Sequence, residues 1–94
     1  MSRRLYVGDL NFEMSDTTLR DTFARVGGVE MAQVVKDRWT GGSRGYGVVE
    51  MMTGEDAEAA IGALDGHAVM GRLLRVALAK SGGTERSNGA PLQQ

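Results

Sequence analysis

Residues 44–51 read RGYGVVEM, and this stretch decides how the chain is expected to fold. Tyr46 and Val48 share one parity, while the two glycines, the second valine and the methionine share the other. A period of two is typical of a β-strand with one face on a core and one face outward. Glycine at inward positions indicates close packing beneath the strand. The stretch therefore predicts a strand that presents Tyr46 and Val48 away from the core.

The remaining elements follow on either side of this strand. LYVGDL at residues 5–10 alternates in the same way and gives Tyr6 the outward parity. Ser15 and Thr53 are typical N-cap residues before runs with helical spacing, and these runs end at residues 27–28 and 64–66. Further strands are expected at residues 29–35 and from residue 73 to near residue 80.

The element order is thus βαββαβ. This order is that of a ferredoxin-like α+β sandwich, in which two helices cover one face of a four-stranded antiparallel sheet. The other face stays open, and strand parity places Arg4, Gln33 and Arg75 on it beside the tyrosines. We expect one domain over residues 1–80, and a flexible polar tail over residues 81–94 because that segment has no apolar period.

The composition fits one small folded domain and excludes several classes of site. Of 94 residues, 41% are hydrophobic and 24% are charged, which is ordinary globular usage. With no Cys and His67 as the one histidine, the chain has neither a disulfide nor a Cys-rich zinc site. No apolar run approaches the ~20 residues of a membrane span. The compartment stays open: cytoplasm for a bacterial one-domain protein, nucleus or organelle for a eukaryotic fragment.

A net charge of -1 is unusual for a nucleic-acid binder, so the distribution of charge matters. Basic residues lie in or beside the predicted strands, and acidic residues lie in or beside the predicted helices. If the two kinds of element form opposite faces, the molecule is polarised. The basic set is Arg3, Arg4, Arg44, Arg75 and Lys80, and the acidic set is Asp16, Asp21, Glu55, Asp56, Glu58 and Asp65.

LYVGDL and RGYGVVEM together resemble the paired motifs of the RNA-recognition motif family. The family's octamer reads basic, Gly, aromatic, Gly or Ala, aromatic, Val, any residue, aromatic. Here Val48 and Met51 replace two of the aromatics, and Asp9 stands where the hexamer usually has Asn. The resemblance runs from about residue 4 to residue 80.

The resemblance implies noncatalytic binding of single-stranded RNA on the open sheet face, in RNA processing or post-transcriptional regulation. It implies that bases stack on Tyr6 and Tyr46, and that Arg44 contacts phosphate. Val48 occupies another stacking position, where it offers only aliphatic contact. Secondary contacts are expected from the flanking positions Arg4, Gln33, Arg75 and Lys80.

Two aromatic residues outside the strands are harder to assign. Trp39 lies in the predicted loop at residues 37–43, where it either packs on the sheet edge or projects as a further stacking surface. Phe12 is expected in the core or at its rim. On the sheet itself, Asp9 and Glu50 would repel phosphate but would accept hydrogen bonds from base amino groups.

Three other functions are possible alternatives to RNA binding. An enzyme is not expected, because the glycines lack a dinucleotide fingerprint and the carboxylates form no evident acid/base pair; no cofactor or metal is implied. The main alternative is a protein-interaction module that binds a peptide through its helical face or a modified sheet. Single-stranded DNA is a further possible partner. We expect a monomer, without a membrane partner.

Overall fold

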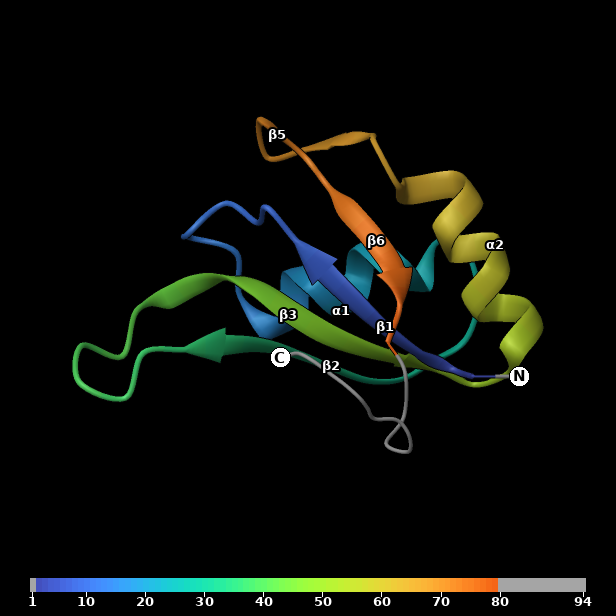
Figure 1. The fold of residues 1–94 in the computed structure, drawn as a ribbon, viewed down its shortest axis with the longest axis horizontal. Coiled ribbons are helices and arrows are strands. Elements are labelled where there is room, and N and C mark those ends of the chain that lie inside the picture. The colour runs from blue at the N-terminus through green and yellow to red at the C-terminus, as the bar shows by residue number, and fades with distance from the viewer. Residues whose placement is uncertain (1, 80–94) are drawn as a thin grey trace, which may run out of the picture.

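The computed structural model describes residues 2–79 (Figure 1). Two helices and the strands of a main sheet follow the predicted order, with a short hairpin before the last strand. Their bounds are β1 Arg4–Gly8, α1 Asp16–Ala24, β2 Val29–Lys36, β3 Ser43–Met51, α2 Gly54–Leu64, β4 Ala68–Val69, β5 Arg72–Leu73 and β6 Arg75–Leu78. None of the helices in this part of the chain is long and apolar enough to cross a membrane.

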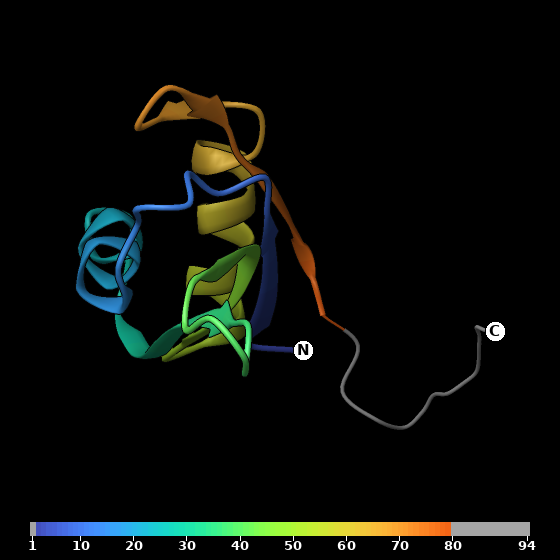
Figure 2. The same ribbon diagram turned by 90° about the vertical axis from the view of Figure 1, so that its left-hand side faces the viewer.

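The main sheet has four antiparallel strands in the order β2-β3-β1-β6. The side view shows α1 and α2 on one side of this sheet, and no described helix or strand lies over the other side (Figure 2). The predicted ferredoxin-like α+β sandwich is therefore confirmed. The two motif strands β1 and β3 are neighbours at its centre, and Tyr6 is paired with Val48.

The core lies between the sheet and the helices, and its residues have the inward parity predicted for them. Phe23 and Leu19 of α1 are fully buried, as are the inward residues of β1 and β3. Gly47 is buried too, because the backbone of the neighbouring strand β2 and the Leu19 side chain of α1 crowd the position that a Cβ atom would take. The full set of buried hydrophobic residues is Leu5, Val7, Leu10, Met14, Leu19, Phe23, Val34, Val49, Met51, Ala57, Ala60, Leu74 and Val76.

Both predicted N-caps are confirmed. The Ser15 hydroxyl accepts the Thr18 N–H at 3.1 Å, and the Thr53 hydroxyl accepts the Asp56 N–H at 3.0 Å. Each bond satisfies one of the backbone donors that a helix start leaves without an intrahelical partner.

Aspartates also occupy both edges of the sheet. Asp16 accepts the backbone N–H of Val34 on β2 at 2.7 Å, and Asp65 accepts that of Val76 on β6 at 2.9 Å. An unpaired strand edge is a template for pairing with another chain. The two carboxylates each accept a backbone N–H group of an edge strand, so that group is not available for pairing with another chain.

The structure differs from the sequence prediction before the last strand. Leu73, where that strand was expected to begin, instead pairs with Ala68 in the short β4–β5 hairpin. This hairpin is held by contacts distant in sequence: the Asn11 side-chain amide donates to the Met70 carbonyl at 2.9 Å. The last strand is therefore shorter than predicted, and Leu73 is exposed.

Candidate nucleic-acid interface

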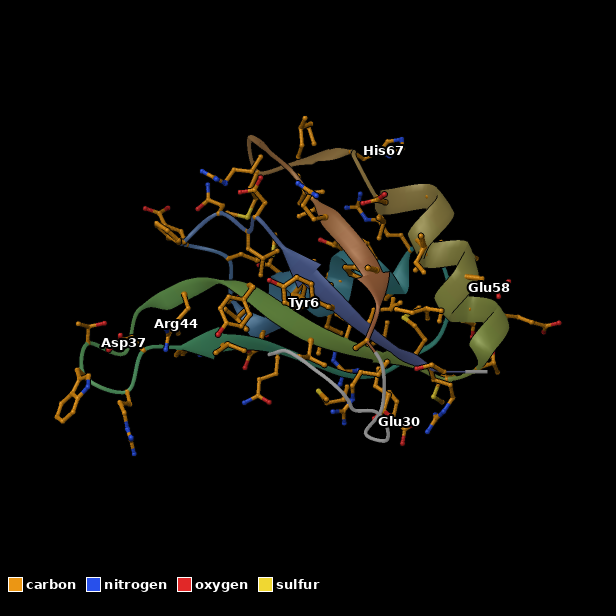
Figure 3. The ribbon with its side chains drawn as sticks, in the orientation of Figure 1. Tyr6, Glu30, Asp37, Arg44, Glu58 and His67 are labelled. Carbon is orange, nitrogen blue, oxygen red and sulfur yellow. The ribbon has the colours of Figure 1, made fainter. Side chains whose placement is uncertain are left out.

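Tyr6 lies on the uncovered face of the sheet (Figure 3), and the Tyr46 ring lies beside it. Their ring centroids are 5.8 Å apart and the ring planes are inclined by 32°. Tyr6 is 44% exposed, and Tyr46 is partly exposed. Neither ring is buried against the helices, so both have surface accessible to a flat ligand.

Gly8 gives the Tyr6 ring room to lie along the sheet. Residue 8 has the same outward parity as Tyr6, and a Cβ atom there would meet the edge of the Tyr6 ring at 3.1 Å and the Arg75 Cβ at 3.6 Å. A hollow of about 610 Å³ opens beside the ring. Its lining residues are Tyr6, Gly8, Asp9, Asp65, Arg75, Val76 and Ala77.

Three arginines lie on the strands that carry the two rings or on the neighbouring strand β6. Arg4 precedes Tyr6 on β1, Arg75 pairs with Gly8 across β1 and β6, and Arg44 lies near the start of β3. All three are exposed, and none forms an ion pair in the described part of the chain. Their charges are therefore free to attract phosphate.

The acidic residues of the same region are paired, which the sequence did not reveal. Glu50 lies 3.8 Å from an Arg3 guanidinium nitrogen, and the Asp9 carboxylate accepts a hydrogen bond from Arg72. Arg3 also pairs with Glu30 at 2.7 Å; this bond and the Glu30 charge raise the pKa of Arg3. The phosphate repulsion expected from Asp9 and Glu50 is thereby reduced.

Other predicted contacts take different positions around the rings. Val48 pairs with Tyr6 on one side and with Gln33 on the other, so these side chains form one row across the open face. Val48 is partly exposed and Gln33 is exposed. Lys80 lies outside the described residues, as does the tail expected after it.

Trp39 projects from the β2–β3 loop and is 87% exposed, so it does not pack on the sheet edge. The Asp37 carboxylate holds the loop by accepting the backbone N–H groups of Trp39 at 2.7 Å and Thr40 at 3.1 Å. These bonds, with a smaller contribution from the Arg44 charge, lower the pKa of Asp37. Phe12 is 69% exposed beside Gly45, so it belongs to the rim of the molecule and not to the core.

The features outside the open face offer little chemistry. His67 is exposed in the connection just before β4. Among residues 2–79 no group of three or more His, Cys, Asp or Glu side chains is placed to hold a metal ion.

Comparison with known proteins identifies the family. The family model described as the RNA recognition motif matches residues 5–75, which is most of the chain. The chain belongs to the RNA recognition motif family. The match includes both motif strands and therefore Tyr6 and Tyr46. It ends at Arg75, the first residue of β6.

Relatives of this RNA recognition motif chain occur in cyanobacteria and plants. RbpA of Nostoc sp. is 47% identical over 76 residues, which cover 81% of this chain and 74% of RbpA. The mitochondrial glycine-rich RNA-binding protein 2 of Arabidopsis thaliana is 45% identical, over 81% of this chain and 48% of the relative. The chain spans only 25% of the chloroplastic 29 kDa ribonucleoprotein B of Nicotiana sylvestris, with 44% identity over 78% of this chain.

Solved structures of RNA recognition motif proteins have the same fold. RNA-binding protein PG1 superposes with a TM-score of 0.80 at 39% identity, covering 93% of this chain and 100% of PG1. The Sex-lethal protein in complex with RNA gives a TM-score of 0.82 at 31% identity, over 88% of this chain and 50% of that one. The Rna15 domain with bound RNA (GU) gives 0.78 at 25% identity, over 89% of each chain.

Proposed function

We propose that this chain binds single-stranded RNA on the open face of its sheet, without catalysis, and that bases stack on Tyr6 and Tyr46. The observation that carries the proposal is the pair of partly exposed rings 5.8 Å apart at the centre of that face. Unpaired bases stack on exposed aromatic side chains, whereas paired bases are hidden within a duplex. The solved relatives with bound RNA support the same use of the fold.

The charges around the rings favour a nucleic-acid strand over a neutral ligand. Arg4, Arg44 and Arg75 are exposed and form no ion pair among the described residues, and they lie on the strands that carry the tyrosines or on the neighbouring strand β6. We infer that they contact phosphates while the rings hold the bases. Gln33, Val48, Trp39 and Lys80 would supply further contacts. Binding of this kind would serve RNA processing or post-transcriptional regulation.

Variants of the two tyrosines test the proposal. Alanine at both positions removes both stacking surfaces, and each stacked base contributes about 1–3 kcal/mol. We therefore expect the Tyr6→Ala, Tyr46→Ala protein to bind a single-stranded RNA at least roughly 30-fold more weakly in fluorescence anisotropy. The matched control is phenylalanine at both positions, which keeps the ring and should keep most of the affinity.

The outcome of this comparison is decisive once circular dichroism shows that the variants are folded. Unchanged affinity of the folded double alanine variant would remove the proposed site. A random single-stranded RNA pool, with matched DNA as a second arm, supplies the ligand for the assay. Equal binding of DNA would broaden the proposed partner to single-stranded nucleic acid.

A second candidate function is peptide binding on the helical side. A hollow of about 390 Å³ lies between the ends of the helices and the β4 strand, with Val26 and Leu64 in its lining and Arg25 and His67 beside them. Against this candidate, the segment before the last strand reads Gly-Arg-Leu-Leu and lacks the Arg-x-Phe loop of peptide-binding family members. NMR shift changes at this hollow on adding a peptide, with none at Tyr6 and Tyr46 on adding RNA, would favour peptide binding over RNA binding on the sheet.

We also propose that the domain acts as a monomer. The support is the capping of both sheet edges, where Asp16 and Asp65 accept N–H groups that a second copy would need. Light scattering during size-exclusion chromatography should give a mass near 10.0 kDa. A concentration-independent dimer mass would contradict this reading.

A further inference from the structure

Asp9 occupies the rim of the hollow beside the Tyr6 ring, and its backbone explains why. Its φ of 62° ends β1 in the left-handed region, which Asp tolerates better than most residues. The alternation of the strand is therefore broken at residue 9. The side chain is not directed to the core but is 45% exposed, and it lines the hollow together with Tyr6 and Arg75.

Arg72 fixes the orientation of this carboxylate. The Arg72 Nη2 donates to Asp9 Oδ1, and the Arg72 Nε donates to the Asp9 backbone carbonyl at 3.3 Å. Two bonds from one guanidinium hold both the side chain and the backbone of Asp9. The other carboxylate oxygen, Oδ2, accepts no hydrogen bond from the described residues. A carboxylate held in place at the hollow thus keeps one acceptor oxygen without a hydrogen-bond partner among the described residues.

A base stacked on Tyr6 would bring its edge to this hollow, because the hollow is lined by Tyr6 and by the neighbouring Asp9. An ionised carboxylate only accepts hydrogen bonds. Cytosine, adenine and guanine each present an exocyclic amino group as a donor. Uracil presents one N–H donor between two carbonyl oxygens. A carboxylate repels these oxygens and therefore disfavours uracil. Asp9 is therefore suited to bases that carry an amino group.

We propose that Asp9, positioned by Arg72, is a specificity residue that selects an amino-bearing base over uracil at the Tyr6 site. Arg75 lines the same hollow, where its charge is placed to contact the phosphate of the same nucleotide. The inference rests on the proposed RNA binding and adds the identity of the base to it.

The test compares hexamers of cytidine and uridine, since these bases are similar in size and differ mainly in the groups at C4 and N3. We expect the wild-type protein to bind the cytidine hexamer about tenfold more tightly, the ratio given by one charged hydrogen bond of about 1.4 kcal/mol. In the Asp9→Asn variant the ratio should fall to within about twofold, because an amide both donates and accepts. Most of the change should come from tighter uridine binding.

Glu58→Gln is the matched control, because it removes one negative charge from the far side of α2 (Figure 3). It should leave the cytidine-to-uridine ratio at the wild-type value. Equal wild-type affinity for the two hexamers would overturn the specificity inference and leave RNA binding in place. If the protein binds neither hexamer and no member of a random single-stranded RNA pool, both the specificity inference and the proposed RNA binding are overturned. A preference retained in folded Asp9→Asn protein would exclude Asp9 as its source.

Discussion

Replacing Gly47 by alanine tests whether the motif strand β3 is packed as closely against strand β2 and helix α1 as the structure indicates. A Cβ atom at this position would lie 2.6 Å from the Gln33 carbonyl oxygen and 3.1 Å from a Leu19 methyl group. The first neighbour is backbone of the adjacent strand β2, which has no rotamer to move aside. The Leu19 side chain is fully buried, so it has little room either.

The size of the effect follows from these distances. Ordinary contacts of a Cβ atom begin near 3.4 Å, so strand β2 would have to move by about 0.8 Å to accommodate the methyl group. Overpacking of a closely packed core costs about 1–3 kcal/mol, and a clash with backbone belongs at the upper end. For a domain of this size, 2–3 kcal/mol lowers the melting temperature by roughly 10–20 °C.

Gly62→Ala is the matched control for this experiment. Gly62 lies within α2, and a Cβ atom there would meet nothing within 4 Å. Alanine should therefore stabilise the helix by about 0.5–1 kcal/mol. Urea denaturation followed by circular dichroism gives both free energies of unfolding. A Gly47→Ala protein within 0.5 kcal/mol of wild type would refute the packing argument, as would a Gly62→Ala protein that is destabilised to the same degree.

Three further predictions concern the core, the loop and the charges. Truncating the fully buried Phe23 to alanine should lower the free energy of unfolding by about 3–5 kcal/mol in urea denaturation, and a loss below 1 kcal/mol would contradict the described core. Hydrogen bonds from the Trp39 and Thr40 backbone lower the pKa of Asp37. These bonds should therefore persist at neutral pH and be lost only as the pH falls through the depressed pKa. An NMR titration of the two backbone amides measures this loss. Three phosphate contacts predict that log affinity for single-stranded RNA falls with log salt concentration with a slope of about -2. Arg44→Gln should reduce the magnitude of this slope by about 0.7. An unchanged slope would exclude Arg44 as a phosphate contact.

The sequence predicted the parts of this molecule that depend on local pattern. The outward parity of Tyr6 and Tyr46, the inward glycine at position 47 and the N-cap at Ser15 all follow from spacing and residue type within a few positions. The pairing of β1 with β3 followed from the topology that the element order implies. These signals are short-range or fixed by the fold, so one sequence was enough to see them.

The contacts that adjust the site were invisible in the sequence because they join distant segments. Asp9 and Arg72 are 63 positions apart, and each alone is an ordinary surface charge. The β4–β5 hairpin was missed for a similar reason, since its two-residue strands are too short to show a period. Phe12 was expected in the core or at its rim. The sequence could not distinguish the two, because the position of the ring depends on its contact with Gly45, a residue distant in sequence.

The central claim is that nucleobases lie on the two tyrosine rings, and proton NMR of the bound RNA measures this most directly. Stacking on an aromatic ring shifts base protons upfield through the ring current. We expect the H5 and H6 resonances of a bound pyrimidine hexamer to move upfield with wild-type protein, and to lose this shift with Tyr6→Leu, Tyr46→Leu protein that remains folded. Base protons that bind without an upfield shift, or that keep it in the leucine variant, would contradict the account.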